Sequence, residues 1–255
     1  MAWALDLDGV VWLGKTLIPG SAEAIARLRV AGERVGFVTN NSFGRRSQVA
    51  ERLAGHGIDP GDDIVTSAVV AAGLVEPGER ALVCGGPGIA EELTLRGVEV
   101  VDASAPEATA GRFDVVVVGY HPTFDYQRMD TASAAVRAGA RLLATNDDAT
   151  YPMDTGIKPG GGAILASIAT ASGATPEVAG KPHRPAAALV RERLGPDGVM
   201  VGDRPDTDGR FAVALGYRFG LVLSGVTTAA DLPTDPPADL TAVDLATLVA
   251  DVLGS

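Results

Sequence analysis

Two aspartates one residue apart, Asp6 and Asp8, follow a short apolar run near the start of the chain and precede Gly9. Side chains alternate along a strand, so carboxylates at positions i and i+2 point to the same side. Where the strand gives way to a turn, both can face one pocket, and a glycine lets the backbone approach a ligand closely. Such a pair suits a reaction in which one carboxylate is ionised and the other carries a proton. A polar turn explains the same residues, so the pair alone leaves both interpretations open.

A second polar segment follows the strand expected at 34–38. It contains Thr39, Asn40 and Asn41. Ligands of open parallel sheets bind beyond the carboxyl ends of the strands. A hydroxyl and backbone N–H groups at such a place could hold phosphate oxygens, although a turn closed by Asx hydrogen bonds would need the same residues.

A lone lysine and an acidic loop come later in the chain. Lys181 stands between a glycine and a proline, where its cation could neutralise a phosphate. The segment 201–208 follows another apolar run and holds Asp203, Asp206 and Asp208. Oxygen-rich loops suit Mg²⁺, which is held by a few carboxylates, waters and substrate phosphate oxygens. Helix capping is an alternative for Asp206 and Asp208, but a weak one for Asp203, which precedes the expected cap.

These segments are positioned by short β-rich runs that alternate with helical patterns, which indicates a mostly parallel sheet flanked by helices. Strands are expected at 2–7, 34–38, 80–84, 98–101, 113–119, 141–145, 199–202 and 219–223, with a strand followed by a helix over 64–75. Helices are expected at 21–30 (with Ser21 as N-cap), 46–54, 88–95, 126–137, 163–171, 185–194, 208–215 and 242–252. A Pro-Gly break at 77–78 predicts a doubly wound core of residues 1–77 plus 177–255, with an α/β domain of residues 78–176 inserted in it.

Composition narrows the class of protein. The chain has 255 residues, of which 46% are hydrophobic, and a formal net charge of −11. Without a basic run, this charge argues against nucleic acid and anionic membranes as partners, and an anionic substrate would need a local cation. Cys84 is the only cysteine, which excludes an intrachain disulfide and a Cys-based zinc site. No signal peptide or long apolar segment is evident, so a soluble, cytoplasmic protein is expected.

Together the four segments resemble the haloacid dehalogenase superfamily of phosphatases. The run Asp6-Leu7-Asp8-Gly9-Val10 looks like its first motif, Thr39 its second, Lys181 its third, and Gly202-Asp203 with Thr207-Asp208 its fourth. The insert resembles the α/β cap of the NagD-like and p-nitrophenylphosphatase branch. The segments 38–42, 145–148, 159–163 and 202–208 are particularly like that branch, and Gly209 and Pro205 depart from its pattern.

The resemblance implies an enzyme with a Rossmann-like core that hydrolyses small phosphate monoesters through an aspartyl phosphate. In it, Asp6 is the nucleophile and Asp8 is the general acid and base. Thr39, the Asn40 N–H and Lys181 hold the phosphoryl oxygens, and Gly9 and Asn41 also line the substrate site. A phosphomutase of the same superfamily and a non-catalytic protein that binds a phosphate ligand are the alternatives, whereas Asp8 and Asp203 argue against a dehalogenase.

The resemblance also implies a metal and a closing cap. Mg²⁺ would be held by Asp6, the backbone carbonyl of Asp8, and Asp203, with Asp208 orienting these ligands. The cap would exclude water and read the leaving group, and a homodimer through the cap is a further possibility in this family. Substrate contacts from the cap are expected at Asn146, Asp147 and Asp148.

Overall fold

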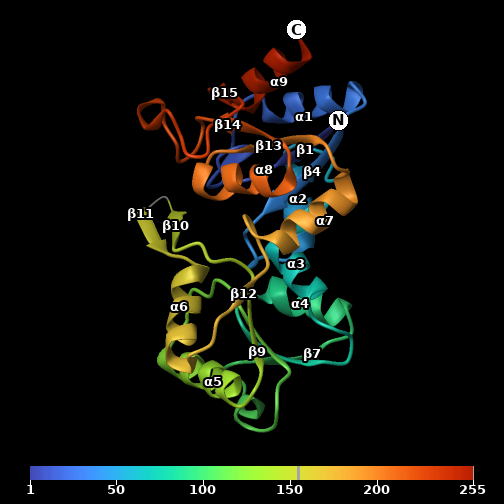
Figure 1. The fold of residues 1–255 in the computed structure, drawn as a ribbon. Coiled ribbons are helices and arrows are strands. Elements are labelled where there is room, and N and C mark those ends of the chain that lie inside the picture. Colours follow the sequence, from blue (N-terminus) through green and yellow to red (C-terminus); the bar gives the residue numbers. More distant parts are fainter. Residues whose placement is uncertain (154–155, 255) are drawn as a thin grey trace. The chain divides into compact units, whose positions relative to one another are not determined.

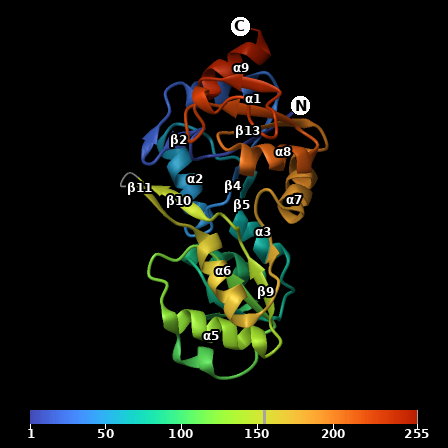
Figure 2. The same cartoon turned by 60° about the vertical axis from the view of Figure 1, so that its left-hand side comes forward.

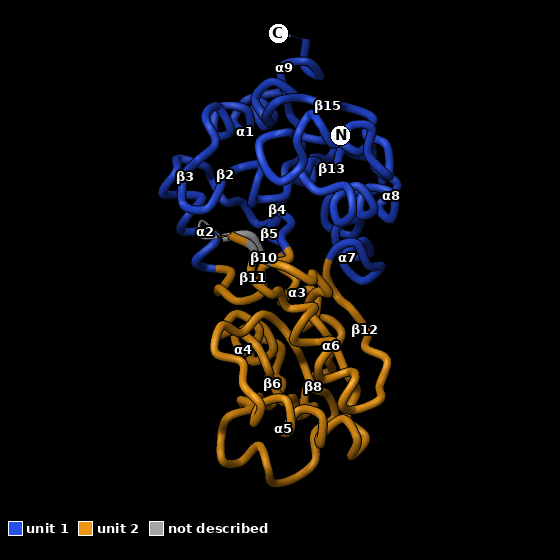
Figure 3. Tube along the Cα trace, turned by 90° about the vertical axis from the view of Figure 1, so that its left-hand side faces the viewer, with its two compact units in different colours: residues 1–39, 47–65, 181–255 blue, residues 40–46, 66–180 orange. Residues whose placement is uncertain are grey.

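The structure is a computed structural model and describes residues 1–153 and 156–254. The chain forms two compact units, coloured separately in Figure 3. Unit 1 comprises Met1–Thr39, Ser47–Val65 and Lys181–Ser255, and unit 2 comprises Asn40–Arg46 and Thr66–Gly180. The sequence predicts a split at other positions (1–77 plus 177–255, and 78–176). In the structure residues 40–46, 66–77 and 177–180 lie in unit 2, and the domain boundaries stay a prediction.

Unit 1 is built on a six-stranded sheet whose order is β15-β14-β13-β1-β4-β5. Its strands are β1 (Ala2–Leu5), β4 (Arg34–Thr39), β5 (Ile64–Thr66), β13 (Gly198–Gly202), β14 (Arg218–Val222) and β15 (Leu240–Ala242). The successive pairs from β15 to β4 run parallel. The chain winds outward from β1 through β4 to β5, and later from β13 to β15 on the other side. In open α/β sheets, ligands bind beyond the carboxyl ends of the strands at such a reversal, which here lies at β1.

Helices cover both faces of this sheet. They are α1 (Ser21–Val30), α2 (Arg46–Gly55), α7 (Arg184–Leu194), α8 (Arg210–Leu215) and α9 (Leu245–Leu253). The alternating residues Trp3 and Leu5 of β1 are fully buried in one hydrophobic cluster with Leu28 of α1, Leu53 of α2 and Leu248 of α9. Figure 1 shows α1 and α9 on one side of the strands and α7 and α8 on the other. A small hairpin, β2 (Trp12–Leu13) and β3 (Thr16–Leu17), follows β1.

Unit 2 repeats this plan with a five-stranded sheet in the order β12-β9-β8-β6-β7, in which every pair is parallel. Its strands are β6 (Arg80–Cys84), β7 (Glu99–Asp102), β8 (Val115–Val118), β9 (Arg141–Ala144) and β12 (Glu177–Val178). Its helices are α3 (Ser67–Gly73), α4 (Pro87–Leu95), α5 (Tyr126–Arg137) and α6 (Gly161–Ser172). The four valines of β8 are all buried, as expected for a strand covered on both faces. Figure 2 shows α5 and α6 packed together on one of these faces.

The predicted fold class is confirmed: the protein is an α/β protein with two parallel sheets, a core and a cap. Two local expectations are wrong, and one hairpin was not foreseen. Gly20, with φ 80°, is the N-cap of α1, and the Ser21 hydroxyl instead donates to the Val10 carbonyl at 3.2 Å. The helix expected over 208–215 begins at Arg210, because Pro205–Gly209 form a turn of π-helix. The hairpin β10 (Thr150–Met153) and β11 (Gly156–Pro159) is not predicted from the sequence.

The remaining short elements are the 3₁₀ turns Pro106–Thr109 and Ala229–Asp231. No helix of the described residues combines the length and the apolar character that crossing a membrane requires.

Candidate active site

The acids predicted from the sequence lie at the carboxyl edge of the unit 1 sheet. Asp6 directly follows β1, Asp203 directly follows β13, and Thr39 ends β4. Leu5 of β1 is in register with both Phe37 of β4 and Val201 of β13. The sheet therefore brings the three loops to the same level, although they are far apart in the sequence.

Three carboxylates gather at this edge. One oxygen each from Asp6, Asp203 and Asp208 lies within 4.8 Å of the others, and all three residues are buried. Unpaired charges at such a place are costly, so buried carboxylates either pair with cations or hold a metal.

Lys181 provides one cation. Its ammonium donates to Asp6 Oδ1 at 2.8 Å and to Asp208 Oδ1 at 2.7 Å, and only 2% of its surface is exposed. Burial by itself would lower the pKa of Lys181, but the carboxylates of Asp208 and Asp6 raise it above the ordinary value. Lys181 is therefore charged at neutral pH. When all four groups are ionised, three carboxylates against one ammonium give the cluster a net charge of −2.

The surplus negative charge affects the pKa values of the carboxyl groups. Burial raises the pKa of Asp6 well above its usual value, Lys181 opposes this shift, and Asp208 and Asp203 reinforce it. Burial, together with the negative charge of Asp208, raises the pKa of Asp203 to about 7, although the Val226 N–H donates to Asp203 Oδ2 at 2.6 Å. A divalent cation bound here would stabilise the ionised form of both carboxyls and so oppose both shifts.

Glycines allow the backbone to pass close to these carboxylates. A Cβ on Gly9 would lie 2.4 Å from Asp203 Oδ2, and its φ of +84° also disfavours any other residue. A Cβ on Gly202 would lie 2.2 Å from the Asp208 carboxylate. The two glycines of the predicted motifs are therefore needed for the space they leave.

Asp8 has different neighbours. Its Oδ1 accepts a hydrogen bond from Trp12 Nε1 at 3.0 Å, and the Arg52 guanidinium lies 3.8 Å from the centre of the Trp12 ring. Burial raises the pKa of Asp8, while the Trp12 hydrogen bond and the charges of Arg52 and Lys181 oppose the shift. A carboxyl with a raised pKa can carry a proton at a pH where an exposed aspartate cannot.

Sequence reasoning missed several residues of this site. Trp12 and Arg52 support Asp8, and the Ser224 hydroxyl donates to the Gly9 carbonyl at 2.7 Å. The only one of these contacts that the sequence indicates is the one from Trp12 to Asp8. A buried indole N–H needs an acceptor, and Asp8 lies four residues before Trp12.

The predicted substrate residues outside unit 1 form a second group, within unit 2. The Asn40 amide donates to Asp148 Oδ2 at 3.0 Å, and the Asn146 amide donates to the Asn40 carbonyl at 2.8 Å. Asn41 and Asp147 are exposed. The structure therefore brings the predicted residues together in two sets. Unit 1 holds Asp6, Asp8, Gly9, Thr39, Lys181, Asp203 and Asp208, and unit 2 holds Asn40, Asn41, Asn146, Asp147 and Asp148.

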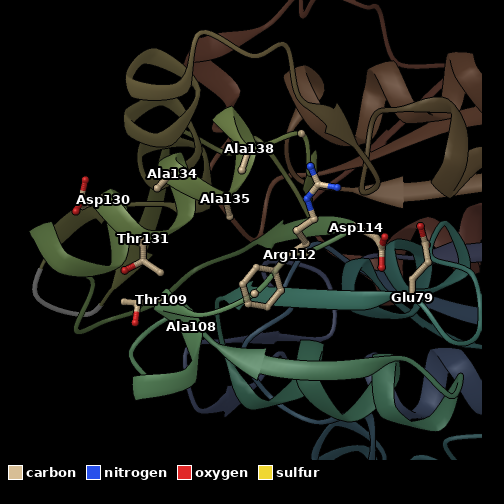
Figure 4. Close-up of a pocket in the computed structure, with 13 residues that line it drawn as sticks. Glu79, Ala108, Thr109, Arg112, Asp114, Asp130, Thr131, Ala134, Ala135 and Ala138 are labelled. Carbon is tan, nitrogen blue, oxygen red and sulfur yellow. The ribbon is translucent and has the colours of Figure 1, made fainter.

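Unit 2 also has a cavity of about 680 Å³, shown in Figure 4. Arg112, Asp114 and Glu79 line it, together with Asp130 and the small residues of α5. None of the predicted site residues contributes to this wall, so the cavity gives no support to the chemistry described above.

Comparison with known proteins places the chain in a family. The model for haloacid dehalogenase-like hydrolases matches residues 3–99, and a second, HAD-hydrolase-like model matches residues 178–248. The acid sugar phosphatase of Staphylococcus aureus is 33% identical over 238 residues, which cover 91% of this chain and 89% of that protein. The D-glycerol 3-phosphate phosphatase of Mycobacterium tuberculosis is 37% identical over 236 residues, 89% of this chain. The match spans 64% of that longer relative.

Comparison with solved structures supports the same family. The p-nitrophenyl phosphatase from Archaeoglobus fulgidus superposes with a TM-score of 0.88 at 30% identity, and the match covers 98% of each chain. The glycerol phosphate phosphatase from Mycobacterium tuberculosis in complex with magnesium has a TM-score of 0.86 at 34% identity, over 97% of this chain and 75% of that one. The chain therefore belongs to the haloacid dehalogenase-like hydrolases, within their NagD and p-nitrophenyl phosphatase family of phosphoric monoester hydrolases.

Proposed function

We propose that the protein is a Mg²⁺-dependent phosphatase that hydrolyses small phosphate monoesters through a phosphoryl group on Asp6. One observation carries the proposal: Lys181 bridges Asp6 and Asp208, and Asp203 completes a buried cluster of three carboxylates. Such a cluster combines a restrained nucleophile, a fixed positive charge and a set of hard oxygen donors.

Asp6 acts as the nucleophile. Lys181 holds its Oδ1, which orients the carboxylate and favours its ionised form against the effect of burial. A carboxylate oxygen attacks phosphorus in line, a bond from Asp6 to phosphorus forms, and the bond to the leaving oxygen breaks with its electron pair on that oxygen.

Asp8 transfers protons in both half-reactions. Its raised pKa favours the protonated form, which donates a proton to the leaving oxygen. The resulting carboxylate then takes a proton from a water that attacks phosphorus. The bond from phosphorus to Asp6 breaks, phosphate leaves, and both aspartates return to their starting states.

The donor set fits Mg²⁺. Asp6 and Asp203, with the backbone carbonyl of Asp8, would hold the ion, and these hard oxygen ligands are the kind it prefers. Asp208 would orient the set, since its two oxygens already accept from Lys181 and from the Arg204 N–H at 3.2 Å. When bound, the ion neutralises carboxylate and phosphate charge and stabilises the charge of the transition state.

The phosphoryl oxygens would be held by Lys181, the Thr39 hydroxyl and the N–H groups of Asn40 and Asn41, with Gly9 leaving room for them. Asp147 and Asp148 of unit 2 stay predicted contacts of the leaving group. The relatives named D-glycerol 3-phosphate phosphatase and acid sugar phosphatase support a small polyol or sugar phosphate as the substrate.

The deciding experiment measures phosphate release from p-nitrophenyl phosphate, glycerol 3-phosphate and sugar phosphates, with Mg²⁺ and with a chelator. Metal-dependent release that disappears in Asp6→Asn would support the proposal. Asp206→Asn is the matched control, because Asp206 is exposed in the same acidic loop and pairs with Arg204. Its release should equal that of the wild type.

Two results would refute the proposal. Release that persists in Asp6→Asn would exclude Asp6 as the nucleophile. No release by the folded wild type from any ester would favour a phosphomutase or a protein that only binds a phosphate ligand.

A further inference from the structure

The Asn40 carbonyl, one residue beyond Thr39, is held from two sides. The Ser67 hydroxyl donates to it at 2.7 Å and the Asn146 amide donates to it at 2.8 Å. Both donors are buried, with 2% and 4% of their surfaces exposed. A carbonyl oxygen has two lone pairs, so these two bonds use its full accepting capacity.

Further hydrogen bonds close this arrangement into a network. The Asn40 amide donates to Asp148 Oδ2 at 3.0 Å, and the Asp148 N–H donates to Asn146 Oδ1 at 3.2 Å. Each member thus restrains the next, and both the backbone and the side chain of Asn40 are fixed. Buried networks of this kind are rigid when their polar groups are satisfied.

Backbone and capping hydrogen bonds fix the segments that contain the two donors, Ser67 and Asn146. Thr66 caps α3 by accepting from the Val69 N–H at 3.2 Å, which sets Ser67 in the first turn of that helix. Asn146 comes two residues after β9, beyond the Thr145 N–H that donates to the Val118 carbonyl at 2.8 Å.

The network also borders the segment that leads to Lys181. The Gly180 N–H donates to the Thr145 carbonyl at 2.8 Å, and a Cβ on Gly180 would lie 2.5 Å from Asn40 Oδ1. Within unit 2, therefore, the residue after Thr39 packs directly against the residue before Lys181. Any shift of Asn40 would disturb both chain segments that lead to the predicted phosphate ligands.

The rest of the segment 40–46 is held in the same way. The hydroxyls of Ser42 and Thr145 are hydrogen-bonded at 2.9 Å, and the Gly88 N–H donates to the Phe43 carbonyl at 3.0 Å. The loop that follows Thr39 is thus a built-in part of unit 2, not a free loop of the core sheet.

We propose that Ser67 and Asn146 are positioning residues for phosphate binding, an inference that rests on the function proposed above. A peptide unit is planar, so fixing the Asn40 carbonyl also fixes the direction of the Asn41 N–H. Through this peptide, Ser67 and Asn146 aim the N–H groups of the loop and restrain Thr39. On this assignment, Asn146 acts through Asn40 and does not contact the leaving group.

The test measures the inhibition constant of inorganic phosphate, with KM and kcat for p-nitrophenyl phosphate. Ser67→Ala and Asn146→Ala should each raise the phosphate inhibition constant roughly 5- to 10-fold, the effect of one lost hydrogen bond. Ser133→Ala is the matched control, because Ser133 is equally buried, in α5, and its hydroxyl has no hydrogen-bond partner among the described residues. Its inhibition constant should stay at the wild-type value.

Asn146→Asp keeps the shape of the side chain but replaces the amide donor with a carboxyl group, whose charge would also repel phosphate. It should weaken phosphate inhibition at least as much as Asn146→Ala. Wild-type inhibition in Ser67→Ala and Asn146→Asp, with melting temperatures that show folded protein, would overturn the inference and leave the proposed function intact. An inactive wild type would refute the proposed function itself.

Discussion

At the scale of single residues, the aspartates of the site differ because their neighbours differ. Asp6 is held by an ammonium, Asp8 by a neutral indole N–H, and Asp203 by a backbone N–H. These different neighbours support the three roles proposed for the same side chain: nucleophile, proton carrier and metal ligand. The general rule is that environments which separate the pKa values of like groups also assign their roles.

The role proposed for Asp8 predicts a dependence on the leaving group. Asp8→Asn cannot donate a proton, so release of a basic alkoxide from glycerol 3-phosphate should fall roughly 10²- to 10⁴-fold. Release of nitrophenolate, which needs little protonation, should fall less in the first step. Burst kinetics with p-nitrophenyl phosphate would measure that step separately from hydrolysis of the phosphoryl enzyme. Equal losses in the first step for both esters would contradict the assignment of Asp8 as general acid.

The pKa of Asp203 predicts how pH affects metal binding. In the metal-free protein this carboxyl has a pKa of about 7, above the value of about 3.9 expected for an unfolded chain. Since folding disfavours its ionised form, the metal-free protein should lose stability as pH rises from about 4 to about 7. Over the same range Mg²⁺ should gain affinity, because binding displaces the proton.

Calorimetric Mg²⁺ titrations in two buffers of different ionisation enthalpy would count the protons released. We expect a released proton below about pH 7 and none well above it. Asp206→Asn should keep this profile, because Asp206 is exposed. Partial burial of its carboxyl raises the pKa of Asp206, but the hydrogen bond and charge of Arg204 outweigh this effect and lower the pKa. An affinity that does not change between about pH 5 and 7 would show that Asp203 does not titrate with the metal.

At the scale of elements, the aspartates of the candidate site lie at the ends of β1 and β13. The close approach of these two strand ends depends on glycines. Gly202→Ala would drive a methyl into the Asp208 carboxylate, so we expect a loss of about 1–3 kcal/mol in the free energy of unfolding. Gly55→Ala, at the end of α2, meets no atom within 4 Å and should stabilise by about 0.4–1 kcal/mol. Urea unfolding would measure both, and equal effects would show that the close contact is relieved without cost.

The strand ends were predictable for a physical reason. An apolar run that stops at Asp6, Thr39 or Asp203 contains both the strand and its polar terminus in neighbouring residues. The support of Asp8 by Arg52 was not predictable, because the two lie on different elements and meet only through packing. The π-helical turn at Pro205–Gly209 was missed for a related reason: capping residues predict a helix start but not the winding of its first turn.

The sequence also does not predict that residues 40–46 belong to unit 2. Nothing in the segment itself indicates that it packs with unit 2, since its partners Ser67, Thr145 and Asn146 are distant in sequence. Motif order alone identifies the polar residues. Which sheet holds them depends on long-range hydrogen bonds that a single sequence does not display.

At the scale of the whole molecule, each unit has its own hydrophobic cluster, and the carboxylates lie in unit 1 alone. Mg²⁺ should therefore stabilise unit 1 against unfolding. Both tryptophans, Trp3 and Trp12, also belong to unit 1, so tryptophan fluorescence reports this unit, whereas far-ultraviolet circular dichroism reports both.

We expect a concentration of Mg²⁺ about 100 times its Kd to stabilise unit 1 by about 2.7 kcal/mol, because a ligand that binds only the folded state adds its binding free energy to folding. The fluorescence melting curve should shift to higher temperature, and a chelator should reverse the shift. A part of the dichroism transition should stay in place, because unit 2 holds none of the three carboxylates. Asp203→Asn should abolish the shift and Asp206→Asn should keep it. A shift that survives in Asp203→Asn would place the metal elsewhere in the protein.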